Sequence, residues 1–156
     1  EKCLAKAERL KQYDNLTIGA HHDLPTLWKF AQKHETPATP NVLAIYTLGK
    51  IAEDFNRIGV EKLRKETERK SGLLYNLVKK HENFEASVKV PRLQSQTVVV
   101  ANTKIESATI IGKLKEKGMV IGSGYGEFKN SQVRIANFPA TSVEETEKLV
   151  KALGEI

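Results

Sequence analysis

The order of apolar segments in the second half of the chain constrains the fold more than any other feature of this sequence. Residues 97–101 are apolar and mostly β-branched, which is typical of a buried strand. Residues 105–117 carry apolar side chains at helical spacing, and residues 119–121 and 133–136 are again short and apolar. Strands and helices that alternate in this way pack as layers around one core. The sequence therefore predicts the α/β class, with a small mixed or antiparallel sheet.

Shorter signals complete this part of the chain. Residues 84–86 and 88–90 are candidates for short strands. Ser142 begins the last helix, and Glu145, three residues later, completes a capping box with it.

A segment with two prolines divides the N-terminal half. Residues 34–41 contain Pro37 and Pro40 and must be extended, because proline lacks an N–H donor and disfavours helix at the residue before it. Residues 2–12 predict a surface helix. Asp23 predicts the N-cap of a second, short helix that runs to about Lys33.

Residues 41–57 have the broadest apolar surface of the chain, which predicts a largely buried helix. Its apolar positions are Leu43, Ile45, Tyr46, Leu48, Ile51, Ala52 and Phe55. Asn41 is its predicted N-cap, Gly59 ends it, and residues 60–81 predict a second, charged helix. We expect a domain boundary inside the first of these two helices.

The net charge of +6 does not predict a nucleic-acid partner. The basic residues alternate with acids, as in residues 61–70, and no basic block is interleaved with aromatics. This pattern is typical of a solvated helix face with i,i+4 pairs. No segment approaches the roughly 18 apolar residues that a membrane helix needs. We therefore expect neither nucleic-acid binding nor a membrane span.

The cysteine content predicts the cellular compartment, and the first residues predict that the chain is part of a longer protein. Cys3 is the only cysteine and cannot form an internal disulfide, which favours a reducing compartment and hence the cytoplasm. The chain has no initiator methionine and opens at Glu1 in a helical pattern. From this we expect a fragment of a longer protein.

Metal and nucleotide sites are not predicted. Adjacent His21 and His22 point in different directions, and no second cluster at metal-ligand spacing accompanies them. Residues 122–126 (GSGYG) follow a strand, as a phosphate-binding loop does, but the Lys-Ser/Thr pair and the following helix are missing. Their three glycines instead suit a turn whose backbone approaches a ligand closely.

Arg134 and residues 36–41 remain as candidate ligand sites. Arg134 alternates with Val133 and Ile135, so it lies on the opposite face of its strand. There it is either solvated or offers a planar guanidinium to a carboxylate. Residues 36–41 lead into a helix N-terminus, where free N–H groups, the helix dipole and threonine hydroxyls suit a phosphate. The alternative for this segment is an ordinary linker with an N-cap.

The two candidate sites occur together in one family. Thr39-Pro40, followed by a helix containing residues 45–49 (IYTLG), resembles the Thr-Pro segment and Ile-Tyr helix of class V aminotransferases. Residues 117–121 (KGMVI), the glycine loop and residues 133–137 (VRIAN) resemble the C-terminal substrate segment of that family. Phosphoserine aminotransferases are the nearest branch.

The resemblance implies a homodimeric enzyme of fold type I that uses pyridoxal 5'-phosphate. Its fold would be the end of the large cofactor-binding domain plus the small C-terminal α/β domain. Residues 1–40 would be the remnant of the large domain, residues 41–57 an interdomain helix and residues 58–156 the small domain. The lysine that forms the Schiff base would precede Glu1 and is not present in this chain, so no catalytic residue is assigned here.

The resemblance also implies roles for single residues. Thr39 matches the threonine that reaches the cofactor phosphate of the other subunit, and Arg134 matches the arginine that binds the α-carboxylate of the substrate. Ala38 stands where the family often has asparagine, so Thr36 or Asn41 would supply that contact.

The substrate loop departs from the phosphoserine branch. Many phosphoserine aminotransferases have a His-Arg pair there for the substrate phosphate, whereas this chain has Gly124 and Tyr125, with Lys129 as the available cation. In this respect the loop is closer to that of the glyoxylate-using aminotransferases of class V.

The leading prediction is that the whole protein exchanges an amino group between 3-phosphoserine and 2-oxoglutarate in serine biosynthesis. Its partners would be a second copy of the chain, the missing N-terminal part, and amino-acid and 2-oxo-acid substrates. The isolated fragment would be inactive. One alternative is a serine- or alanine-glyoxylate aminotransferase. The other is a stand-alone α/β interaction domain, which an upstream start codon without a lysine-bearing domain would favour.

Overall fold

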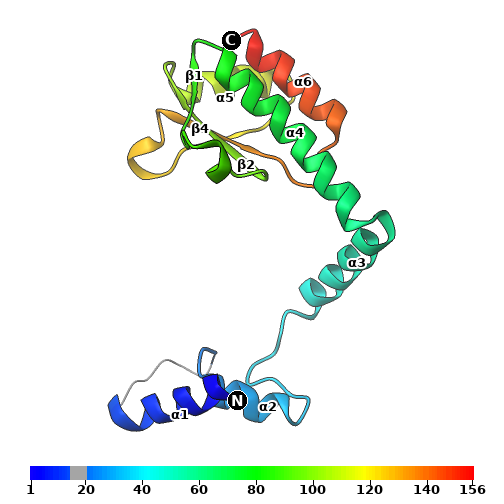
Figure 1. Cartoon of the computed structure of the whole chain (residues 1–156), viewed down its shortest axis with the longest axis vertical. Coiled ribbons are helices and arrows are strands. Elements are labelled where there is room, and N and C mark those ends of the chain that lie inside the picture. Colours follow the sequence, from blue (N-terminus) through cyan, green and yellow to red (C-terminus); the bar gives the residue numbers. More distant parts are fainter. Residues whose placement is uncertain (15–20) are drawn as a thin grey trace. The chain divides into compact units, whose positions relative to one another are not determined.

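The computed structural model describes residues 1–14 and 21–156, and it divides into two compact units, Glu1–Glu53 and Asp54–Ile156 (Figure 1). The first unit contains α1 (Lys2–Asp14) and α2 (Leu24–Ala31). Helix α3 (Val42–Ile58) begins in the first unit and ends in the second. The predicted three-part division at residues 40 and 57 stays a prediction.

Asp23 joins α1 to α2 through its side chain. Its Oδ2 atom accepts a hydrogen bond from Lys11 Nζ at 2.6 Å and another from the Thr26 hydroxyl. These two bonds hold the pKa of Asp23 below its ordinary value, and the bond from Lys11 has the larger effect. Asp23 stands at the predicted N-cap position, but its carboxylate caps no backbone N–H. Helix α2 ends at Ala31, earlier than predicted, because the chain turns there and His34 takes a left-handed φ of 59°.

Helix α3 begins as predicted, but its predicted burial is wrong. Asn41 Oδ1 accepts a hydrogen bond from the Ala44 N–H at 3.0 Å, which confirms the N-cap. None of the residues of α3 is buried, and Leu43 and Leu48 are 76% and 67% exposed. The apolar surface has the width of a buried helix, but no described residue covers it.

The second unit is a four-stranded antiparallel sheet with three helices, which confirms the predicted α/β class. The sheet order is β1-β2-β4-β3, with β1 (Phe84–Ala86), β2 (Val98–Thr103), β3 (Gly122–Ser123) and β4 (Gln132–Ala136). The helices are α4 (Val60–Lys80), α5 (Ser107–Glu116) and α6 (Val143–Gly154). Helix α4 follows Gly59, whose φ of 96° separates it from α3. Figure 1 shows α6 lying beside α4, and the two helices are in contact.

The core lies on one face of this sheet. Val99 and Ala101 on β2, paired with Ile135 and Val133 on β4, are at most 3% exposed. They pack into one apolar cluster with side chains of all three helices, which include Leu74, Val78, Ile110, Leu114 and Leu153. Because side chains alternate along a strand, Val100 and Arg134, which are paired with each other, lie on the opposite face.

Two predicted strands are wrong. Residues 88–90 form no ladder, since Gln94 Nε2 donates to the Val88 carbonyl at 2.9 Å and Val90 leads into the 3-10 turn η1 (Pro91–Leu93). Residues 119–121 are not a strand, because the ladder with β4 starts one residue later, at the pair of Gly122 and Arg134. Part of the predicted glycine loop is therefore β3, and a 3-10 turn, η2 (Gly126–Phe128), follows it.

Buried polar side chains join α4 to the chain after β4. Lys70 is 2% exposed, and its Nζ atom donates to the carbonyl oxygens of Phe138 (3.0 Å) and Thr141 (2.6 Å). Asn137 Nδ2 donates to the Thr67 carbonyl at 3.0 Å. Helix α6 then begins with the predicted capping box of Ser142 and Glu145. These contacts fix the path of the chain just beyond Arg134.

Candidate functional site

Arg134 lies half-buried on the sheet face that the helices leave open. Its Nε–H donates to the Ser123 carbonyl of the neighbouring strand at 2.6 Å. Its guanidinium carbon is 3.8 Å from the centroid of the Tyr125 ring, a cation–π contact. The side chain therefore extends over β3 toward the glycine loop instead of projecting freely into solvent.

Gly122 makes room for this arrangement. It pairs with Arg134 in the ladder, and a Cβ atom on it would lie 3.1 Å from Arg134 Nη2. Only a residue without a side chain leaves that space free. Among the described residues, no hydrogen-bond acceptor is recorded for Nη1 or Nη2 of Arg134, although Nε is satisfied. The two terminal nitrogens can therefore receive an anion side by side.

The other loop residues predicted to bind substrate have different surroundings. Gly124 is buried, its N–H donates to the Gln132 carbonyl at 2.8 Å, and a Cβ on it would overlap the Phe128 carbonyl oxygen. It closes the turn through its backbone. Lys129 is exposed, and its carbonyl accepts a hydrogen bond from the Ser107 hydroxyl at 2.6 Å. No contact of the Lys129 ammonium is recorded among the described residues.

Sequence reasoning missed a polar row beside Arg134. Gln132, two residues earlier on the same strand face, donates through Nε2 to Asn102 Oδ1 at 2.8 Å and to Ser87 Oγ at 3.4 Å. Glu85, which pairs with Asn102 in the sheet, has its pKa lowered mainly by Lys89 and in smaller part by Asn102. The i,i+2 spacing of Gln132 and Arg134 was the available sequence signal.

In the first unit, the residues predicted to bind the cofactor phosphate are all exposed. The Thr36 hydroxyl donates to the Ala38 carbonyl at 2.7 Å, and Asn41 Oδ1 is used by the helix cap. No hydrogen bond of the Thr39 hydroxyl is recorded within the described ranges. Thr39 Oγ1 and Asn41 Nδ2 are therefore the side-chain donors that remain available beside the N-terminus of α3.

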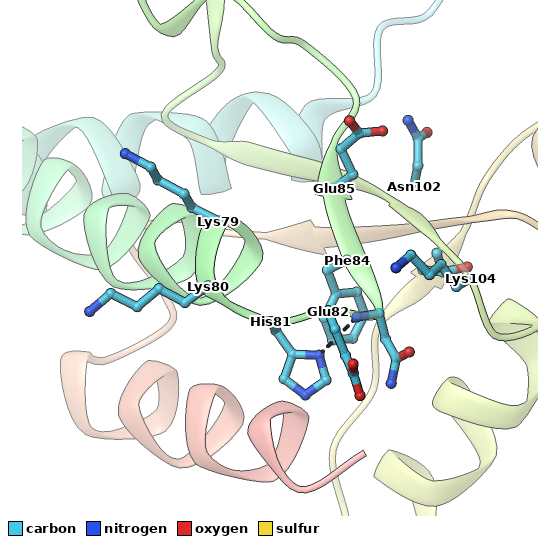
Figure 2. Close-up of a pocket in the computed structure, with 10 residues that line it drawn as sticks. Lys79, Lys80, His81, Glu82, Phe84, Glu85, Asn102 and Lys104 are labelled. Atoms are coloured by element: carbon cyan, nitrogen blue, oxygen red, sulfur yellow. Dashed lines mark hydrogen bonds between the residues drawn. The ribbon is translucent and has the colours of Figure 1, made fainter.

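A separate depression of about 580 Å³ lies between the end of α4, β1 and the end of β2. Figure 2 shows Lys79 and Lys80 extending away from Phe84 and Asn102, so the cations do not converge on one point. Both lysines belong to the last turn of α4, where positive charge stabilises a helix C-terminus. The His81 and Phe84 rings are in contact in a tilted arrangement, with centroids 5.1 Å apart. We assign no ligand to this depression.

Other classes of site find little support. Within residues 1–14 and 21–156 no group of three potential metal ligands comes together, and His21 and His22 are exposed. In the same part of the chain no helix has both the length and the apolarity to cross a bilayer. Cys3 is exposed and free.

Comparison with known proteins identifies relatives over nearly the whole chain. Residues 4–137 match the family model described as aminotransferase class-V. The structure of a phosphoserine aminotransferase from Cytophaga hutchinsonii superposes with a TM-score of 0.86 and 36% identity, covering 97% of this chain and 42% of that one. No curated protein matches the chain in sequence.

Two more distant structures have the same fold. The aspartate aminotransferase of subgroup IV from Thermus thermophilus has a TM-score of 0.73 at 20% identity, over 90% of this chain and 39% of its own. The phosphoserine aminotransferase from Bacillus circulans subsp. alkalophilus has a TM-score of 0.74 at 17% identity, over 88% and 38%. This chain thus spans about two-fifths of the length of each of these three proteins.

Proposed function

Because this chain belongs to the class V aminotransferase family, we propose that it is the C-terminal part of a pyridoxal-phosphate-dependent enzyme that exchanges an amino group between 3-phosphoserine and 2-oxoglutarate. The identity of 36% to the phosphoserine aminotransferase from Cytophaga hutchinsonii, over 97% of this chain, supports the choice of reaction. Within this chain the proposal depends on one observation: Arg134 is held by the Ser123 carbonyl and the Tyr125 ring, and its two terminal nitrogens are left available.

Arg134 holds the substrate by its α-carboxylate. Its Nε is committed to Ser123, while the two terminal nitrogens are without a recorded acceptor among the described residues. A carboxylate accepts two parallel hydrogen bonds from such a planar pair, which fixes its orientation as well as its position. The Cα atom beside that carboxylate is then held in one place, and positioning of this kind lowers the barrier to proton removal from Cα.

The residues near the start of α3 suit the phosphate of the cofactor. Thr39 Oγ1, Asn41 Nδ2 and the free N–H groups of the first helical turn are hydrogen-bond donors at the positive end of a helix dipole. The Thr36 hydroxyl is a weaker candidate, because its proton is already used by Ala38. When bound, pyridoxal phosphate supplies the electron sink of the reaction. No lysine of this chain is assigned to carry it, so the chain alone is expected to be inactive.

The exposed apolar surface of α3 supports a partner. Val42, Leu43, Ile45, Tyr46 and Leu48 are each at least 60% exposed. A contiguous apolar surface of this kind on a helix is normally covered by protein. We assign it to the rest of the subunit and to a second copy of the chain, which would bring Thr39 to the cofactor of the opposite subunit. We place the protein in the cytoplasm, consistent with its single, free cysteine.

A serine- or alanine-glyoxylate aminotransferase is the second candidate. One observation favours it: residues 122–129 contain no histidine or arginine, so Lys129 is the only cation there for a substrate phosphate. For the phosphoserine candidate, Lys129 would have to bind the substrate phosphate alone. No contact of its ammonium is recorded among the described residues, so the ammonium is available for that role.

Turnover by the full-length enzyme separates the two candidates. The donor 3-phosphoserine is assayed with 2-oxoglutarate, and alanine and serine are assayed with glyoxylate. The proposal predicts a higher kcat/KM for phosphoserine than for either other donor, and a KM for phosphoserine that rises in Lys129→Gln. Lys115→Gln, on the exposed side of α5, is the matched control. Turnover of alanine with phosphoserine inert would overturn the substrate assignment and retain the family.

A further inference from the structure

We propose that Tyr125 and Gly122 are positioning residues for Arg134, and that they hold its guanidinium so that both terminal nitrogens face the substrate carboxylate. This inference rests on the proposed function for the identity of the bound group. The placement of the guanidinium itself depends only on contacts within the second unit.

Three neighbours restrict the guanidinium from different directions. The Ser123 carbonyl binds the Nε edge at 2.6 Å, and the Tyr125 ring covers one face at 3.8 Å. Gly122 lies so close that a Cβ would be 3.1 Å from Nη2. A free arginine has many rotamers and loses that freedom whenever it binds a ligand. Contacts that restrict the guanidinium before a ligand arrives lower the entropic cost of binding a carboxylate.

The exposure of Tyr125 supports a role toward Arg134. Its side chain is in the loop between β3 and η2 and is 73% exposed, so burial in the core does not explain its position. Its recorded contact within the described residues is the one with the Arg134 guanidinium. A ring on one face of a guanidinium leaves the in-plane N–H groups of the terminal nitrogens free, and these are the donors that a carboxylate uses.

The ladder places Gly122 directly opposite Arg134. An alanine there would place its Cβ 3.1 Å from Nη2, so the guanidinium would have to move away by a few tenths of an ångström. That displacement works against the hydrogen bond to Ser123 and the contact with Tyr125. The glycine loop therefore acts through its backbone and one aromatic ring, and it needs no cation of its own to serve the α-carboxylate.

Steady-state kinetics of the full-length holoenzyme test the inference in variants at position 125. Tyr125→Leu removes the ring, and the KM for the amino donor is expected to rise about 3- to 30-fold with kcat little changed. Tyr125→Phe keeps the π face and is expected to retain the wild-type KM. Gly122→Ala is expected to raise KM as well. Phe128→Leu, an exposed aromatic of the same loop without a recorded contact to Arg134, is the matched control.

A second measurement needs neither cofactor nor turnover. Phenylglyoxal modification of Arg134 is followed by peptide mass spectrometry in the unliganded protein, with exposed Arg92 as internal reference. Arg134 is expected to react several-fold faster in Tyr125→Leu than in the wild type, and at the wild-type rate in Tyr125→Phe. An unchanged rate in Tyr125→Leu, or an unchanged donor KM in an active enzyme, overturns the inference. Absence of transamination in the wild type would instead overturn the proposed function, and the modification rates would still decide the role of Tyr125.

Discussion

Lys70 is a charged side chain in the interior of the second unit. It is 2% exposed and binds only backbone carbonyl oxygens in its recorded contacts, those of Phe138 and Thr141. Loss of solvation lowers the pKa of Lys70 below its ordinary value of 10.5, and the nearby Glu66 and Glu145 offset this only in part. The unfolded chain therefore binds a proton at this lysine at pH values where the folded chain has begun to release it.

This difference predicts a pH dependence of stability. Because the unfolded state binds more protons in the interval between the folded pKa and 10.5, the free energy of unfolding rises with pH across that interval. Lys70→Met has no ionisable group at this position, so the wild type should gain stability relative to the variant as pH rises from about 7 to about 10. Urea unfolding of both proteins over that range measures the difference. A difference that stays constant would show that Lys70 has an ordinary pKa in the folded state, and one that falls with pH would show a raised pKa; either result contradicts the prediction.

At the residue scale, the surroundings of some side chains could be predicted from the sequence, and those of others could not. Alternation along residues 132–136 correctly separated Arg134 from the buried Val133 and Ile135. Lys70 could not be predicted, because a lysine in a charged helix looks the same whether it faces solvent or a pair of carbonyl oxygens 68 and 71 positions away. Its partners are set by tertiary structure.

At the element scale, three local signals were reliable, whereas the N-cap predicted at Asp23 and two of the predicted strands were not. The N-cap at Asn41, the break at Gly59 and the capping box at Ser142 are determined by neighbours within four residues, and all three were predicted. The strands predicted at 88–90 and 119–121 failed, because a strand exists only where a partner strand supplies the ladder. Apolar content alone does not identify that partner.

The turn between β3 and β4 gives a prediction at this scale. Gly124→Ala places a Cβ against the Phe128 carbonyl oxygen, so the backbone must shift, at a cost of about 1–3 kcal/mol in the free energy of unfolding. Gly112→Ala in α5 is the matched control, because nothing lies within 4 Å of its Cβ position. That control should raise stability by about 0.5–1 kcal/mol. Denaturant unfolding of both variants checks the opposite signs, and equal effects would contradict the crowded geometry at Gly124.

At the scale of the whole molecule, the main feature is the apolar surface of α3, which no described residue covers. The sequence correctly predicted a helix with a broad apolar surface, but burial was wrong because the covering surface is not among the described residues of this chain. The fold of the second unit was predictable because its core is complete within residues 54–156. The assignment of Thr36, Thr39 and Asn41 to the cofactor phosphate stays a prediction, because these side chains are exposed and no described contact tests it.

The exposed surface of α3 predicts self-association of the isolated chain. Ile45 and Leu48 are 60% and 67% exposed and lie one turn apart, so they share a face. The double variant Ile45→Lys/Leu48→Lys should sediment as a monomer at concentrations where the wild type forms larger species. Glu61→Lys/Glu116→Lys, which adds cations at exposed positions of α4 and α5, is the control for charge. Identical sedimentation of all three proteins would indicate that α3 is not a contact surface.

We propose above all that Arg134 receives the α-carboxylate of the substrate. The most direct test of this role is the KM for the amino donor in Arg134→Gln of the full-length enzyme, with Arg92→Gln as control. Because Arg134→Gln removes the charged partner of the carboxylate, donor binding is expected to weaken by about 2–5 kcal/mol, with the absorbance of the bound cofactor retained. A donor KM that stays at the wild-type value, with the cofactor still bound, would contradict it.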